Sequence, residues 1–266
     1  MGKLNEADAR ERAANPLGKE FSQALARGLA ILTTFDPDSP SLTLSAVAQR
    51  VGLPRATTRR ALLTLAQLGY VEERDKQFRL TPRVLRVAGA YLGSSIASTI
   101  LQPLCETLAA QHGVTFSVAA LDGVDAVMIA YAMPRRLYVQ GAGIGLRIPA
   151  HCSAVGRVLL SGLHPDALRA FLKQLRPQAL TPHTVLDKTQ IAEAIDEAGR
   201  QRHAVVENEA EVGFRSLAVP LCGQDGRTRF ALNVGAAIRY EEVGDLRQRY
   251  LPILKDVAAD LRAQLI

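Results

Sequence analysis

The chain contains 266 residues with a mass of 28.7 kDa, a length that fits two ordinary domains without disulfide or metal support. Apolar residues make up 48% of the chain and charged residues 22%, which excludes a largely disordered chain and a fibre. No apolar run approaches the ~18 residues of a membrane-spanning helix. The charged N-terminal stretch also lacks the apolar core of an export signal, so we expect a cytoplasmic protein.

The formal net charge of +6 is concentrated in one segment. Residues 50–89 contain nine basic and three acidic side chains, so this segment alone carries +6 and the rest of the chain sums to zero. A local basic segment on an otherwise neutral protein favours a polyanionic partner, most often nucleic acid. A solvated basic surface without a partner is the alternative, and the elements within the segment decide between the two.

The N-terminal third shows helical periodicity interrupted by turn residues. Residues 21–35 predict a helix, and residues 36–40, rich in Asp and Pro, predict a turn. Residues 44–51 predict a short second helix, for which either Ser41 or Thr43 is available as the N-terminal cap.

A tight turn joins this second helix to a third. Gly52 can adopt the left-handed backbone that ends a helix, and Pro54 suits the start of the next one. Residues 55–68 then predict a helix with arginine and threonine near the N-terminal end of its outward side. This pattern is typical of a helix-turn-helix, whose second helix meets base edges and phosphates. Three packed helices without a DNA role are the alternative.

Residues 71–80 predict a β-hairpin with a polar tip at residues 74–77. A helix-turn-helix followed by a basic hairpin is a winged helix, so we expect the tip of the wing to contact the DNA backbone or minor groove. The candidate DNA-binding residues are therefore Arg55, Thr57, Thr58, Arg59 and Arg60 in the recognition helix and Arg74 and Lys76 in the wing.

The rest of the chain predicts helices around an antiparallel sheet. Residues 84–92 predict a linker helix and residues 93–95 a hinge, and strands at residues 114–121 and 126–132 are joined by an Asp-Gly turn. The other expected elements are helices at residues 96–111, 153–163, 191–202 and 246–265, and strands at residues 137–140, 204–206, 216–222 and 230–236. This mixture predicts an α+β domain.

Motifs for catalysis are weak in this part of the chain. His151 and Cys152 are adjacent, but neighbouring residues rarely face each other and no third, orienting group is evident. Glu207, Glu209 and Glu211 alternate, which is most often a solvated strand edge. The chain's three cysteines are widely spaced and favour neither disulfides nor zinc. We therefore predict no enzyme activity, no metal and no cofactor.

A ligand pocket is the remaining hypothesis for this domain. Ser153 opens a helix whose backbone N–H groups offer a site for a carboxylate. Ser216 and Asn233 on two expected strands add polar groups to an apolar cavity. The pattern therefore predicts a small organic acid as the ligand.

Three segments of the chain resemble the IclR family of bacterial transcription regulators, a resemblance that extends from about residue 21 onward. One is the helix-turn-helix segment at residues 44–71, with LSAVA, GLPRATTRRAL and LGYV. The others are PAHCSAVGRVLL at residues 149–160 and EAEVGFRSLAVP at residues 209–220. The resemblance implies a GAF-like effector domain and assembly as a homodimer or a dimer of dimers.

The resemblance also implies an effector pocket. The family's pocket positions correspond here to Leu137, Ile148, Ala154, Val155, Val206, Ser216, Asn233 and Gly235, to which we add Cys152 and Ser153 beside them. Val206 stands where some members have an acidic side chain, and Ser216 where some have Cys, which disfavours a small polar ligand such as glyoxylate. Regulators of protocatechuate and para-hydroxybenzoate catabolism are similar to this chain at residues 147–150, 156–160, 181–184, 215–220 and 231–235, which implies an aromatic acid as effector.

We therefore predict a ligand-responsive regulator that binds double-stranded promoter DNA and controls an aromatic-acid catabolic operon. Its expected parts are a flexible tail (residues 1–20), a winged helix-turn-helix domain (21–82), a linker helix with hinge (83–95) and an effector and oligomerisation domain (96–266). The alternatives are a constitutive DNA-binding regulator whose C-terminal domain only oligomerises, and a hydrolase that uses Cys152 and His151. Repressor and activator are equally compatible with the sequence.

Overall fold

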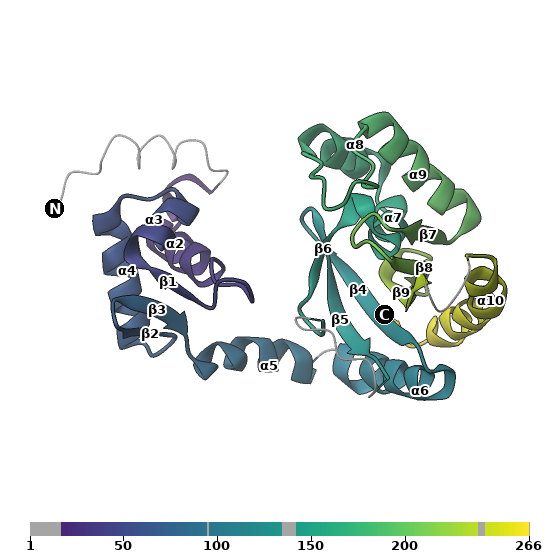
Figure 1. Ribbon diagram of the computed structural model, residues 1–266, viewed down its shortest axis with the longest axis horizontal. Coiled ribbons are helices and arrows are strands. Elements are labelled where there is room, and N and C mark those ends of the chain that lie inside the picture. The colour runs from purple at the N-terminus through teal and green to yellow at the C-terminus, as the bar shows by residue number, and fades with distance from the viewer. Residues whose placement is uncertain (1–16, 95, 135–141, 239–242, 266) are drawn as a thin grey trace. The chain divides into compact units, whose positions relative to one another are not determined.

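The computed structural model describes residues 17–94, 96–134, 142–238 and 243–265. The chain divides into two compact units, Met1–Tyr91 and Leu92–Ile266 (Figure 1). Within the described ranges, no helix is both long enough and apolar enough to cross a membrane.

In the described part of the first unit, three helices pack with a small antiparallel sheet. Its elements are α2 (Gln23–Leu32), β1 (Ser41–Thr43), α3 (Leu44–Val51), α4 (Arg55–Gln67), β2 (Val71–Arg74) and β3 (Gln77–Leu80). The strand order is β1-β3-β2, so β1 adds a third strand beside the wing hairpin. Ile31, Val47, Leu62 and Phe78 form its buried core. The predicted winged helix-turn-helix is confirmed.

Local signals in the sequence explain the turn between α3 and α4. The Thr43 hydroxyl accepts a hydrogen bond from the N–H of Ala46 at 3.2 Å, so Thr43 and not Ser41 caps α3. Gly52 follows α3 with φ of 65°, a left-handed conformation that costs glycine nothing. Pro54 then precedes α4, as expected.

A 3₁₀ turn at Pro82–Val84 leads into α5 (Leu85–Ser94), the linker helix. Gly93 and Ser94 of the expected hinge continue α5. Ser95 lies outside the described residues. A glycine near the end of a helix signals a break only when its backbone turns left-handed, and Gly93 does not.

Over its described residues, the second unit is built on a six-stranded antiparallel sheet with the order β6-β5-β4-β9-β8-β7. The strands are β4 (Thr115–Asp122), β5 (Asp125–Ala132), β6 (Arg147–Pro149), β7 (Ala204–Glu207), β8 (Phe214–Cys222) and β9 (Thr228–Ala237). The helices are α6 (Gln102–His112), α7 (Ala154–Ser161), α8 (Pro165–Gln174), α9 (Lys188–Gln201) and α10 (Val243–Leu261). The predicted α+β architecture is confirmed, while the expected strand at residues 137–140 lies outside the described residues.

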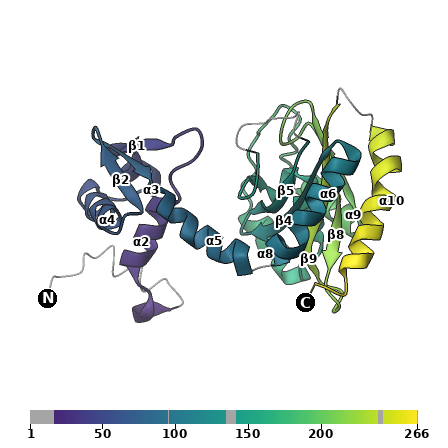
Figure 2. The same cartoon turned by 90° about the horizontal axis from the view of Figure 1, so that it is seen from below.

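Different helices cover the two faces of this sheet. On one face α6 packs along β4 and β5, and α10 along β8 and β9 (Figure 2). The hydrophobic core on this face includes Phe116, Leu232 and Tyr250. On the other face α7 lies on β4, β7, β8 and β9, with α9 behind it. This second face is rich in alanine, including Ala119, Ala218 and Ala231. Small side chains allow α7 to lie close to the sheet. The candidate effector residues lie on this same face, near the start of α7.

Candidate functional site

The recognition helix α4 carries its positive charge outward. Arg55, Arg59 and Arg60 are exposed, and Leu62 and Leu65 on the opposite side belong to the core. In the part of the chain that the structure describes, none of these guanidinium groups pairs with a carboxylate. Their positive charge is therefore available to a polyanion.

Thr57 lies half-buried between these arginines, whereas Thr58 is fully buried. The Thr58 hydroxyl donates a hydrogen bond to the Pro54 carbonyl at 3.2 Å, which satisfies it inside the domain. The prediction that Thr58 contacts DNA is therefore wrong, because the side chain faces the core and not the groove.

Other basic residues of the segment have structural partners. The Arg50 guanidinium donates hydrogen bonds to the Asp36 carboxylate at 2.8 Å, the Thr34 carbonyl at 2.7 Å and the Ser39 hydroxyl at 2.7 Å. Arg50 thus ties α3 to the preceding turn. Arg83 lies over the Tyr70 ring, 5.7 Å from its centre.

The wing turns at Asp75 and Lys76, which have φ angles of 51° and 62°. Two successive positive φ angles match the right-handed twist of a two-residue hairpin. The turn places the exposed Lys76 at the tip, where the hairpin pattern predicted a polar turn. The wing therefore carries the Lys76 ammonium group at its tip, in the turn between β2 and β3.

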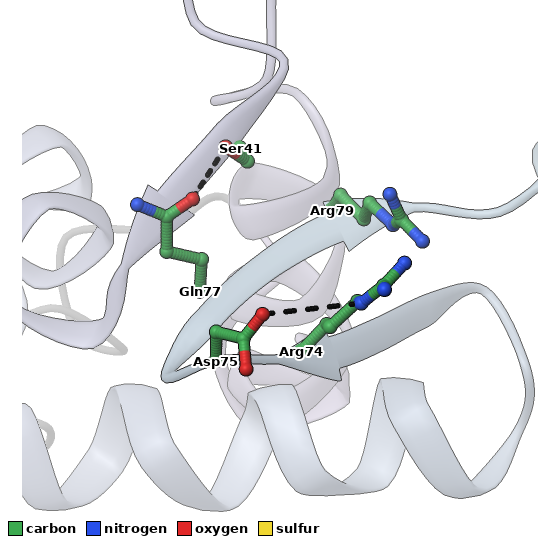
Figure 3. Close-up of a pocket in the computed structure, with 5 residues that line it drawn as sticks. All are labelled: Ser41, Arg74, Asp75, Gln77 and Arg79. Carbon is green, nitrogen blue, oxygen red and sulfur yellow. Dashed lines mark hydrogen bonds and ion pairs between the residues drawn. The ribbon is translucent and has the colours of Figure 1, made fainter.

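A surface hollow of about 230 Å³ lies on the wing and is lined by Ser41, Arg74, Asp75, Gln77 and Arg79 (Figure 3). Each arginine of the hollow has an acidic neighbour. Arg74 Nε lies 3.9 Å from a carboxylate oxygen of Asp75, and Arg79 forms an ion pair with Glu72. The Ser41 hydroxyl donates to the Gln77 side-chain oxygen at 2.7 Å and joins β1 to the wing. The excess positive charge of residues 50–89 therefore lies on α4 and directly after the wing.

The candidate effector residues of the second unit gather on the α7 face of the sheet. Val206 is paired with Ser216 across β7 and β8, and Ser216 with Gly235 across β8 and β9. Asn233 lies opposite Ala218, which packs against α7. Side chains alternate along a strand, so Ser216, Asn233 and Gly235 share this face.

Ile148 on β6 packs against the same cluster, whereas Leu137 lies outside the described residues. A Cβ atom at Gly235 would lie 2.5 Å from the Phe214 ring, so the glycine makes room for this aromatic side chain. Phe214 was not predicted, because nothing in the sequence indicates that its ring lies over Gly235.

The start of α7 supplies buried hydrogen-bond donors. The Ser153 hydroxyl accepts from the Gly156 N–H at 3.2 Å and caps the helix. Among the described residues, nothing accepts a hydrogen bond from the backbone N–H of Ala154 or Val155, although both residues are buried. Unpaired N–H groups at a helix start attract an anion. This geometry agrees with the carboxylate site expected there.

Gly156 holds the segment before α7 against the helix. A Cβ atom at this position would lie 2.1 Å from the Ala150 carbonyl oxygen, so the backbones approach too closely for any other residue. The 3₁₀ turn at Ala150–Cys152 therefore packs directly on the first turn of α7.

A buried ion pair lies beside this helix start. Arg157 is 2.8 Å from a carboxylate oxygen of Glu209, and its Nε donates to the His151 carbonyl at 3.1 Å. The Glu209 carbonyl accepts from the Thr184 hydroxyl at 2.6 Å. The expectation of a solvated edge is wrong for Glu209, which is 8% exposed. The pair joins α7, the turn before it and two loops into one network.

The geometry of His151 and Cys152 does not form a nucleophilic pair. Burial raises the pKa of the Cys152 thiol to about 11, and the thiol donates to the Pro149 carbonyl at 3.5 Å. Burial, with the Arg157 guanidinium nearby, lowers the pKa of His151, so the imidazole is neutral. Within the described ranges, neither imidazole nitrogen has a hydrogen-bond partner. A protonated thiol beside an unpaired imidazole lacks the activation that a cysteine hydrolase needs.

The described residues contain no group of three or more His, Cys, Asp or Glu side chains placed to hold a metal ion. Ser117 on β4 is a polar residue of the α7 face that was not predicted. It lies opposite Asn233 and accepts a hydrogen bond from its Nδ2 at 3.3 Å. Its signal in the sequence is a lone serine among buried apolar neighbours on a predicted strand.

These two units define a winged-helix DNA-binding protein with a separate ligand-responsive α+β domain. The IclR helix-turn-helix domain matches residues 24–75, and the bacterial transcriptional regulator IclR C-terminal domain matches residues 90–263. The chain belongs to the IclR family of bacterial transcriptional regulators, as its sequence motifs implied.

Individual relatives sharpen this assignment. The chain is 35% identical to the Pca operon regulatory protein of Acinetobacter baylyi, over 92% of this chain and 89% of that protein. It is 33% identical to the p-hydroxybenzoate hydroxylase transcriptional activator of the same organism, over 92% of each chain. These relatives are transcription regulators, which supports the predicted regulator over the hydrolase.

A solved structure is similar to the second unit. It is a double mutant of the inducer binding domain of the PobR transcription factor from Acinetobacter, in complex with 3-hydroxybenzoic acid. The TM-score is 0.60 at 27% identity, over 64% of this chain and all of that chain.

Proposed function

We propose that the protein senses an aromatic acid and controls transcription of genes for aromatic-acid catabolism. Relatives that regulate the Pca operon and p-hydroxybenzoate hydroxylase support this assignment. The observation that carries the proposal is the pair of buried, unpaired N–H donors of Ala154 and Val155, because such donors suit a carboxylate. The apolar side chains of Ile148 and Val206 on the same face suit an aromatic ring.

A thermal-shift series on the full chain tests the sensor. The ligands are para-hydroxybenzoate, protocatechuate and benzoate, with glyoxylate and succinate as aliphatic controls. A ligand of the native state at a hundredfold excess over its Kd adds about 2.7 kcal/mol to the free energy of unfolding. Stabilisation by aromatic acids alone supports the proposal. No shift with any acid would instead favour a constitutive regulator whose second domain only oligomerises.

For DNA recognition, we propose that the α4 residues Arg55, Thr57, Arg59 and Arg60 enter the major groove. Arg74 and Lys76 of the wing would hold the DNA backbone. The exposed guanidinium groups of α4 support this arrangement. Binding of double-stranded promoter DNA then depends on counterion release and weakens as salt rises.

The double variant Arg59→Ala with Arg60→Ala tests the recognition helix. We expect weaker operator binding, and a slope of affinity against salt that falls by about one for each phosphate that the variant no longer neutralises. Arg169→Ala on α8 is the control, because this exposed arginine lies in the other unit. Operator affinity equal to that of the unchanged protein would contradict the assignment.

We further propose that the protein works in the cytoplasm as a homodimer or a dimer of dimers. Helix α5 has one charged residue among ten, and Leu85, Val87 and Tyr91 are each more than half exposed. A helix that is apolar all round is normally covered. Two copies would place two recognition helices on a near-palindromic site. Sedimentation of the variant Val87→Glu with Tyr91→Glu tests this: a species of unchanged size would contradict the role of α5.

The proposed division of labour follows the sequence. We propose that residues 21–82 bind DNA, residues 83–95 connect the two domains, and residues 96–266 bind the effector and oligomerise. Removal of residues 1–20 should leave operator affinity unchanged, as measured by fluorescence anisotropy.

A further inference from the structure

We propose that Asn233 and Ser117 read a hydroxyl group on the ring of the effector, with Asn233 Oδ1 accepting a hydrogen bond from that hydroxyl. The inference rests on the proposed function, because it concerns the ligand of the same domain. It adds a requirement for a hydrogen-bond donor on the ring to the requirement for a carboxylate, and it gives Ser117 a role.

The first observation is an unpaired acceptor inside the domain. Asn233 is 6% exposed, and among the described residues its Oδ1 has no hydrogen-bond partner. The same amide donates through Nδ2 to the hydroxyl of Ser117, which is 1% exposed, at 3.3 Å. With Nδ2 bonded to Ser117, Oδ1 is the open atom of the amide. Buried acceptors are almost always satisfied, so a donor from elsewhere is expected.

The second observation is the position of this acceptor on the sheet. Asn233 and Ser117 are directly opposite on β9 and β4, and Asn233 faces Ala218 on β8. Two residues along β9, Gly235 lies opposite Ser216, so the pair borders the candidate effector positions. The acceptor therefore shares a face with the helix start that suits a carboxylate.

The third observation is the apolar surface that α7 contributes to this face. Four α7 residues belong to the hydrophobic cluster there: Ala154, Val155, Val158 and Leu159. None of these side chains can donate a hydrogen bond to Asn233. A small molecule that carries a donor is therefore the partner class that fits an unpaired amide oxygen on this face.

These contacts assign a chemistry to the two ends of the ligand. The carboxylate accepts from the backbone N–H groups of Ala154 and Val155, and a ring hydroxyl donates to Asn233 Oδ1. An acid with a hydroxylated ring satisfies both ends, whereas benzoate leaves the amide oxygen unpaired. A methoxy group lacks a proton to donate, so it also leaves the oxygen unpaired.

Calorimetric titration of the full chain measures the preference. The ligands are 3-hydroxybenzoate, para-hydroxybenzoate, protocatechuate, benzoate and 4-methoxybenzoate. At least one hydroxylated acid should bind roughly tenfold or more tightly than benzoate and 4-methoxybenzoate, because a polar group left unpaired weakens binding strongly. A methoxy acid that binds as tightly as the hydroxylated acid would overturn the acceptor role of Oδ1.

Variants of Asn233 and Ser117 test the role of each residue separately. Asn233→Leu removes the acceptor and keeps the branched shape with the same number of side-chain heavy atoms, so the hydroxylated acids should lose their advantage while benzoate binding changes little. Ser117→Ala releases Nδ2 and should reduce the same preference. Ser161→Ala is the matched control, because its hydroxyl bonds the Val158 carbonyl at the other end of α7. It should keep the preference of the unchanged protein.

The outcomes distinguish this inference from the function on which it rests. Equal affinity for benzoate and all hydroxylated acids would overturn the role of Asn233 and leave the aromatic-acid sensor intact. A preference that survives in Asn233→Leu would overturn it as well. No binding of any aromatic acid would overturn the sensor itself. If Asn233→Leu does not fold, the ligand series on the unchanged protein decides.

Discussion

The two units of this protein use charge in opposite ways. In α4 the guanidinium groups of Arg55, Arg59 and Arg60 are exposed and, within the described chain, have no acidic partner. In the second unit Arg157 and Glu209 are buried and bonded to each other. Exposed cations serve an outside partner and contribute little to folding, whereas a buried pair fixes the protein around itself. Loss of charge should therefore weaken DNA binding in the first unit and folding in the second.

The largest effect is expected from Glu209→Gln. It leaves the Arg157 guanidinium buried without a compensating charge, which costs about 3–5 kcal/mol of the free energy of unfolding. Urea unfolding of the second unit, followed by circular dichroism, measures the loss. Arg200→Ala is the control, since Arg200 pairs with Asp196 and Glu197 on the surface and should change little. Equal losses in both variants would remove the contrast between buried and exposed pairs.

Substitution of one helix glycine in each unit compares how closely the two helices pack. Gly156→Ala on α7 drives a methyl group into the Ala150 carbonyl and should destabilise the second unit by about 1–3 kcal/mol. Gly28→Ala on α2 meets open space and should stabilise the first unit by up to about 1 kcal/mol. Calorimetric unfolding resolves the two units. A gain of stability in Gly156→Ala would show that the turn before α7 is not held by close contact.

A smaller effect on DNA affinity should separate two wing cations. Lys76→Ala removes an exposed charge at the tip and should lower operator affinity and reduce the salt slope by about one. Arg79→Ala should have less effect, because Arg79 already pairs with Glu72. Fluorescence anisotropy at several salt concentrations measures both. A larger loss for Arg79→Ala would mean that the balanced hollow, not the tip, meets the DNA.

The pH dependence should also differ between the units, because all five histidines lie after residue 91. Burial lowers the pKa of His151 and of His203 in the folded protein. Below pH 6.5 the unfolded chain then binds more protons than the folded one, so the second unit loses stability as pH falls.

Calorimetry between pH 7 and pH 5 measures this loss. The transition of the first unit should shift less, and His151→Leu should reduce the shift of the second. An equal shift of both transitions would contradict the assignment to histidine.

Structural features that depend on neighbouring residues could be predicted from the sequence. The helical periodicity of α4 and the turn at Gly52 depend on neighbours within a few positions, and both agree with the structure. The sequence left the cap of α3 open between Ser41 and Thr43, because both hydroxyl residues precede the helix. Strand β1 was missed, because its three residues form a strand only by pairing with β3 far along the chain. Thr58 was misplaced, since a hydroxyl bonded to its own helix can be buried as an apolar group.

The candidate effector site depends on longer distances. Arg157 and Glu209 are 52 residues apart, and Ser117 and Asn233 are 116 residues apart. No local pattern links such residues, so the alternation of Glu207, Glu209 and Glu211 suggested solvent where the structure has a buried ion pair. Family resemblance supplied positions on β8 and β9, but it did not include the partner of Asn233 on β4.

The donors at the start of α7 have a consequence for how such a sensor evolves. Main-chain N–H groups are removed only by substitution to proline, so the proposed recognition of the acid end is insulated from every other single substitution. The groups proposed to read the ring are side chains, Ser117 and Asn233, which one codon change can replace. A lineage built on this domain can therefore diversify among ring substituents while its preference for carboxylic acids is inherited unchanged.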